Sequence, residues 1–150
     1  MTLALHAQDE EDLQVISAYL QDAVGVMGSM AWQPKKRRFA MLVNRFLWEK
    51  NAKAGLFSPT VPQRIQTGVH FEGVEKVQVQ NLPIGEKDAA FDLLAVRFAP
   101  SADPDDPGGH IELDFAGVGS MRLQVECIDV FMADRGEPWP VTRRPRHPGA

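Results

Sequence analysis

The chain has only one cysteine, Cys127, and no long hydrophobic run. A single cysteine excludes an internal disulfide and any metal site built from several cysteines. The longest stretch without a charged residue spans only residues 23–34, whereas a transmembrane helix requires about 20 apolar residues. The first residues also carry no basic cluster of the kind that begins a secretory signal peptide. We therefore expect a soluble protein of the reducing cytoplasm that makes no membrane contact.

Motifs for metal, nucleotide or nucleophilic chemistry are also missing. No two histidines have ligand spacing, and no glycine pattern matches a phosphate-binding loop. Asp103, Asp105 and Gly108 stand at the spacing of a calcium loop, but Pro107 occupies a ligand position, so we expect a solvated acidic loop. Cys127 lies among apolar residues, as an inert buried thiol does. We therefore predict no catalytic residue, no metal and no cofactor.

Length and composition indicate one globular domain. The 150 residues are 44% hydrophobic and 24% charged, which is typical of a folded chain with one core. Prolines and arginines accumulate after Gly136. We therefore predict a domain over residues 1–136 and a basic, proline-rich tail over 137–150 that is extended or disordered.

Charges are segregated along the chain although the net charge is only −4. Residues 1–33 and 99–115 each hold five acidic residues and no lysine or arginine. Residues 34–54 hold seven basic residues against one glutamate. Such blocks indicate complementary surfaces within one molecule or between two, and they favour a homodimer.

Hydrophobic spacing predicts an α+β fold that is mostly antiparallel. Apolar residues at helical spacing after Asp9 predict an N-terminal helix over 9–20, with Asp9 as N-cap. Strict alternation on both sides of 117–119 predicts a β-hairpin in which Met121, Leu123 and Val125 are buried. The other strands are expected near 23–27, 29–32, 38–48, 65–71, 74–80 and 89–98. They form one antiparallel sheet or a partly closed barrel.

The spacing of Ile128, Phe131 and Met132 predicts a short helix near the C-terminus. Residues 39–46 also match residues 91–98 at four identical positions, which include Arg45 and Arg97. A common composition of two core strands is the plainer explanation of this match, and two pseudo-repeated halves are the alternative.

Several short stretches together resemble a known family. They include Asp12-Leu13 before Ile16, Arg38-Phe39, Asn44-Arg45-Phe46 with Trp48-Glu49, and Arg122-Leu123 with Val125-Glu126-Cys127-Ile128. The chain resembles, over about residues 5–136, an uncharacterised bacterial family of single-domain proteins known only as a domain of unknown function. The resemblance implies a free-standing domain and assigns no activity or catalytic residue.

The basic turn at residues 35–38 is the best binding candidate in the sequence. Cations beside an exposed aromatic residue can hold phosphate and stack a nucleobase. The candidate binding residues are Trp32, Lys35, Lys36, Arg37 and Arg38. An acidic protein partner fits the same charges, and a solvated turn whose cations discourage edge pairing is the plain alternative.

The sequence leaves the function open and favours a non-enzymatic binding or scaffold protein. One alternative is an RNA- or nucleotide-binding module that uses the basic turn. The other is an enzyme with an unrecognised site, for which His70, Glu72 and Arg97 are the first residues to test.

Overall fold

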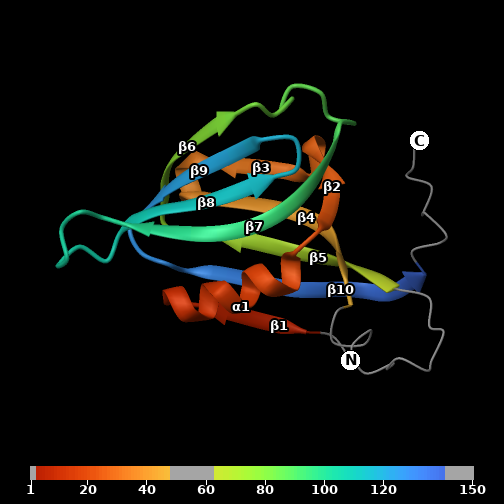
Figure 1. Cartoon of the computed structure of the whole chain (residues 1–150), viewed down its shortest axis with the longest axis horizontal. Coiled ribbons are helices and arrows are strands. Elements are labelled where there is room, and N and C mark those ends of the chain that lie inside the picture. Colours follow the sequence, from red (N-terminus) through yellow and green to blue (C-terminus); the bar gives the residue numbers. More distant parts are fainter. Residues whose placement is uncertain (1–2, 48–62, 141–150) are drawn as a thin grey trace.

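In the computed structural model, residues 3–47 and 63–140 are described, and they form one sheet and one α-helix (Figure 1). The helix α1 spans Glu10–Leu20. The strands are β1 (Ala4–Ala7), β2 (Ala23–Val26), β3 (Met30–Gln33), β4 (Arg38–Phe46), β5 (Gln63–Phe71), β6 (Val74–Gln80), β7 (Ala90–Pro100), β8 (Gly109–Phe115), β9 (Gly119–Val125) and β10 (Val130–Pro140). Two short 3₁₀ turns, η1 (Met27–Ser29) and η2 (Pro34–Lys36), precede β3 and β4.

The ten strands form a single antiparallel sheet in the order β1-β10-β5-β4-β2-β7-β8-β9-β6, with β3 paired to β4. The predicted α+β class with a mostly antiparallel sheet is confirmed. The sheet does not close into a barrel, because β1 and β6 stand at its two ends. The segment between the strands predicted at 38–48 and 65–71 falls almost entirely outside the described residues, and so does the part of the predicted tail beyond Pro140.

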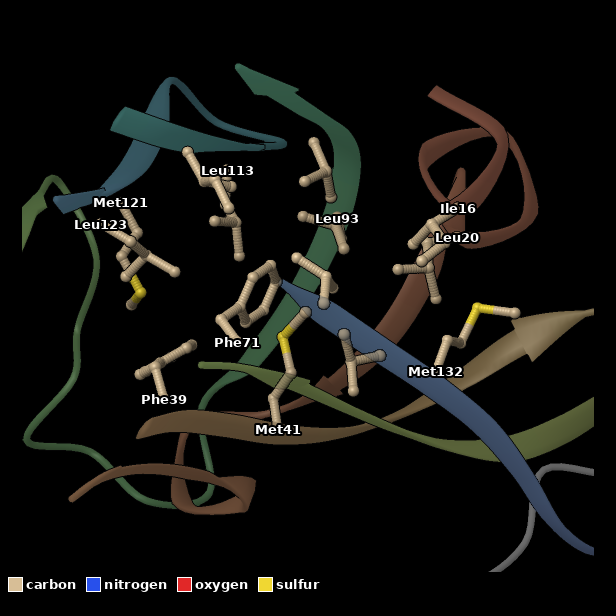
Figure 2. Packing of buried hydrophobic residues seen from close by; sticks show 14 of the residues in the cluster. Ile16, Leu20, Phe39, Met41, Phe71, Leu93, Leu113, Met121, Leu123 and Met132 are labelled. Atoms are coloured by element: carbon tan, nitrogen blue, oxygen red, sulfur yellow. The ribbon is translucent and has the colours of Figure 1, made fainter. Parts of the chain in front are cut away.

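Sharp bends fold the sheet over its own core. The chain turns from β5 into β6 at Gly73, whose φ of 66° is a left-handed conformation that favours glycine. The Val74 N–H donates to the Arg37 carbonyl at 2.8 Å, and the Glu126 N–H donates to the Gly73 carbonyl at 3.1 Å. These bonds hold β6 and β9 over the inner side of β4, β5 and β10, where the buried apolar side chains gather (Figure 2).

Helix α1 covers one open side of the curved sheet. It packs mainly against β7 and β1 through its buried residues Leu13, Ile16 and Leu20. Asp9 caps the helix as predicted, since its Oδ1 accepts the Asp12 N–H at 2.7 Å. The Ser17 hydroxyl accepts the Val96 N–H at 2.9 Å, next to a bulge in β7. Among the described residues, no helix is long and apolar enough to cross a membrane.

The hairpin of β8 and β9 is confirmed. Met121, Leu123 and Val125 are buried, while Arg122 and Gln124 point away from the core and are exposed. Strand β4 is also confirmed, and burial alternates along it. The second short strand begins at Met30, because η1 takes up the residues around Gly28.

The predicted C-terminal helix is wrong, because its residues belong to β10 and to the bend before it. Strand β10 pairs with β1 on one side and with β5 on the other. Pairing on both edges satisfies its backbone groups, so sheet formation prevails over the helical spacing. Ile128 is buried in the bend, Met132 faces the core, and Phe131 points to the outer face.

The two pseudo-repeated halves are not supported. Phe39 and Phe91 are both buried, but the matched arginines have opposite environments. Arg45 is completely buried, whereas the side chain of Arg97 is 56% exposed. Strand β7 contains a bulge within the matched segment, which changes the face of its later residues.

Candidate functional site

The predicted basic turn is the connection between β3 and β4. Pro34 begins η2, and Arg37 ends it with a left-handed φ of 53°. Lys35 and Lys36 are exposed in the turn. Trp32 precedes it on β3 and keeps 36% of its surface exposed. The turn therefore displays two lysines near an accessible indole.

Glutamates neutralise both arginines of the turn. Arg37 forms an ion pair with Glu126 and a longer one with Glu75, at 3.9 Å. Arg38 Nε donates to Glu72 Oε2 at 2.8 Å, and this hydrogen bond and charge raise the pKa of Arg38. In the described part of the chain, the cations of the turn that remain without an acidic partner are Lys35 and Lys36.

The turn lies against the beginning of β6. The Val74 N–H bonds to the Arg37 carbonyl, and η2 contacts β6. In the described residues, β6 pairs only with β9 and stands at one end of the sheet. Its exposed Lys76 also forms no ion pair there, so three lysines flank the start of this edge.

A hollow of about 370 Å³ lies on the outer face of β6 and β9. It is lined by Gln78, Gln80, Ser120, Arg122 and Glu112, together with parts of Val79 and Met121. Arg122 Nη2 donates to Glu112 Oε1 at 3.1 Å, so the charged groups of the lining neutralise each other. The hollow therefore offers hydrogen-bonding groups rather than net charge.

The residues named for an enzyme are only partly brought together. His70 Nδ1 lies 2.8 Å from Glu72 Oε2. Burial opposes ionisation of Glu72, but hydrogen bonds from Arg38 and His70 outweigh it and lower the pKa of Glu72. Arg97 lies in another part of the sheet, on β7, where its hydrogen bond to Asp114 raises the pKa of Arg97. These three residues therefore do not form one catalytic cluster.

A stack of three rings crosses the outer face of β1, β10 and β5. The ring centroids of His6 and Phe131 are 4.0 Å apart, and the two ring planes meet at an angle of 11°. His70 stacks on the other side of Phe131 at 4.6 Å and 14°. His6 Nε2 also contacts Asp129 Oδ1 at 2.6 Å. Sequence reasoning missed this group because the three rings are neighbours only through strand pairing.

Asp92, on β7, has a partly buried carboxyl group with a raised pKa. Its Oδ1 is buried and has no hydrogen-bond partner in the structure that is described. Burial and the negative charge of Asp22 raise the pKa of Asp92, while Arg64 opposes the shift. A carboxyl group of this kind can hold a proton better than a surface acid. The sequence carries no signal for it, since the strand pairing creates the environment.

In the described ranges, no group of three or more histidines, cysteines or acids is placed to hold a metal. In the acidic loop, Asp103 Oδ1 accepts the Asp105 N–H, and Asp106 Oδ1 accepts the Gly108 N–H. These carboxylates therefore stabilise the turn of their own loop.

The expectation of a buried Cys127 is wrong, because this thiol is exposed at the bend between β9 and β10.

The fold defines the molecule as an α+β protein built on one open antiparallel sheet. The chain belongs to the family described as "Protein of unknown function (DUF2948)", which it matches over residues 3–147. The family resemblance noted in the sequence is thereby confirmed over nearly the whole chain. No curated protein and no solved structure matches the chain.

Proposed function

We propose that this protein is a non-enzymatic binding protein that takes an extended acidic segment of a partner protein along the edge of β6. The observation that carries the proposal is the edge of β6 beside the basic turn, which no strand of the described residues covers. An exposed strand edge presents backbone donors and acceptors in a row, and an extended peptide can add to it as a further strand.

The length and composition of β6 support strand addition. The strand has seven residues and no proline, so each residue keeps its backbone N–H group, and that of Val74 is already bonded to the Arg37 carbonyl. Val77 and Val79 face the core but stay partly exposed, whereas Gln78 and Gln80 line the outer hollow. An added strand would meet an apolar side and a polar side, which selects a peptide with alternating side chains.

The charges beside this edge favour an acidic segment. Lys35, Lys36 and Lys76 lie near its beginning without acidic partners in the described structure. Glu75, on the same strand, already contacts Arg37. Each exposed ion pair contributes only about 0.2–1 kcal/mol, so the lysines would add selectivity to backbone hydrogen bonds.

Fluorescence anisotropy with a labelled peptide of alternating glutamate and valine tests the proposal on the full chain. We expect this peptide to bind and a matched lysine–valine peptide not to bind. The triple variant Lys35→Glu, Lys36→Glu, Lys76→Glu should weaken binding by about tenfold or more, since three ion pairs are lost. The control Lys87→Glu changes an exposed lysine of the loop between β6 and β7 and should leave the affinity unchanged.

A short single-stranded RNA provides the competing measurement. Tight binding of RNA with a steep salt dependence, and no binding of the acidic peptide, would support the nucleic-acid alternative instead. Trp32 distinguishes the two further, because stacking of a base on it would make RNA affinity depend on this residue. Equal binding of both peptides would also contradict the proposal.

A further inference from the structure

The outer face of β10 carries a charge and size pattern that is complementary to itself. Along the chain, the side chains on this face are those of Asp129, which stands just before the strand and contacts His6, and of Phe131, Ala133 and Arg135 within the strand. The order is therefore acid, aromatic, small, base. Read in the opposite direction, it becomes base, small, aromatic, acid, so each residue meets its complement when the strand faces a reversed copy of itself.

The two ends of the pattern have accessible charges. The side chain of Asp129 is 35% exposed and contacts only His6 among the charged groups of the described chain. Arg135 is exposed and forms no ion pair within the described residues. The Cδ of Arg135 lies 4.0 Å from the place that a Cβ would occupy at Gly68, so this side chain extends over β5.

The middle of the face combines a partly exposed aromatic residue, Phe131, with a small exposed one, Ala133. Phe131 is held upright between His6 and His70 by the stacking contacts described above. The next pair of residues across β10 and β5 on this face has small side chains, because Ala133 pairs with Gly68. Gly68 itself is bordered by the side chains of Leu42 and Arg135, whose Cδ2 and Cδ lie 3.8 Å and 4.0 Å from the place of a Cβ there, so the small and exposed Ala133 is the residue that can face a ring.

We infer that a second copy of this chain binds this face and forms a symmetric homodimer. Asp129 and Arg135 each lie three residues from Met132. A two-fold axis that lies in the interface, at right angles to β10 beside Met132, sets Asp129 of each copy opposite Arg135 of the other, and Phe131 opposite Ala133. Such an interface uses the same surface on both copies, as two-fold dimers do. Two sheets packed face to face lie about 10 Å apart, which lets side chains of this size interdigitate.

A charge swap tests this dimer specifically. In the full chain, sedimentation velocity at low salt should show a dimer at micromolar concentration. The Arg135→Asp variant places two acids opposite each other at both ends of the interface, and it should raise the dissociation constant at least about tenfold. Arg135 is exposed, so this variant should keep the fold, which circular dichroism checks.

The variant that combines Asp129→Arg with Arg135→Asp restores opposite charges across the two-fold axis and should restore the dimer. The control Glu86→Arg alters an exposed acid in the loop between β6 and β7 and should dimerise like the wild type. A monomeric wild-type chain would overturn the inference. A dimer that ignores Arg135→Asp, or a double variant that stays monomeric, would overturn it as well. These outcomes are independent of peptide binding at β6, which uses the other end of the sheet.

Discussion

The guanidinium of Arg45 and the carboxylate of Asp134 form a two-point salt bridge inside the protein. The Nε–Oδ1 distance is 2.8 Å, the Nη2–Oδ2 distance is 2.6 Å, and the two side chains are 0% and 1% exposed. Asp134 also accepts the Thr67 hydroxyl at 2.8 Å and the Leu3 N–H at 3.2 Å. These bonds connect β4, β5 and β10 with the residue before β1. Because both charges are enclosed, the cluster acts as a structural link rather than as an open binding site.

Removal of one partner from this pair should be severely destabilising. We expect Arg45→Ala to lower the free energy of unfolding by about 3–5 kcal/mol, because Asp134 would remain buried without its cation. Urea unfolding of the purified chain measures the change. The matched control is Arg97→Ala, which removes a similar two-point pair with Asp114 from an exposed surface. Exposed pairs contribute about 0–1 kcal/mol, so equal losses in the two variants would contradict the assigned role.

Acid should remove the contribution of Asp134 to stability. Burial opposes its ionisation, but hydrogen bonds from Arg45 and Thr67 outweigh burial and lower the pKa of Asp134. The carboxyl group of Asp134 therefore takes up a proton at a higher pH in the unfolded chain than in the folded chain. The stabilisation is present above about pH 4 and is lost as the pH falls towards the folded pKa.

Urea unfolding at a series of pH values tests this dependence. The wild type should lose stability steeply below about pH 4, where an ordinary aspartate becomes protonated. The Asp134→Asn variant should be less stable at neutral pH and should lose less on acidification. Parallel curves for the two proteins would show that another group controls the acid sensitivity.

The β8–β9 hairpin provides a test of the core. Leu123 is 0% exposed, so Leu123→Ala should cost about 2–5 kcal/mol through lost burial and the cavity that remains. Gln124→Ala, on the exposed side of the same strand, should stay within about 0.5 kcal/mol of the wild type. Thermal and urea unfolding both report the difference, and a small effect at Leu123 would contradict its position in the core.

The exposed position of Cys127 predicts that it reacts in the folded protein. A disulfide reagent that releases a coloured thiolate should label one thiol per chain without denaturant, since Cys127 is the single cysteine and lies at the surface. Labelling that begins only after unfolding would instead support the buried thiol that the neighbouring apolar residues indicated.

Local patterns predicted the elements whose stabilising contacts are close in sequence. The Asp9 cap and the spacing of Leu13, Ile16 and Leu20 predicted α1, because a helix forms from neighbours three and four residues apart. The alternation around Gly117 predicted the hairpin of β8 and β9, because its two strands meet through one short turn. Distant pairing overturned the helix predicted at Ile128, Phe131 and Met132, since β10 obtains partners on both edges.

The candidate site was predicted only in part, for the same reason. The sequence identified the basic turn, but not that Glu126 and Glu72 neutralise Arg37 and Arg38. His70 and Glu72, two residues apart, lie on one side, where His70 Nδ1 is 2.8 Å from Glu72 Oε2. No sequence pattern indicated the stack of His6 and His70 on Phe131, because β1, β10 and β5 are far apart along the chain.

The sequence by itself determined the strand-rich composition, the capped helix and the positions of the charge blocks, since each depends on residues that are close in the chain. The tertiary structure decided which charges remain available. It buried Arg45 against Asp134, 89 residues away, and left Arg97 on the surface although both stand in nearly the same local sequence. The energy of a charge depends on its partner and on the water around it, and folding alone supplies both.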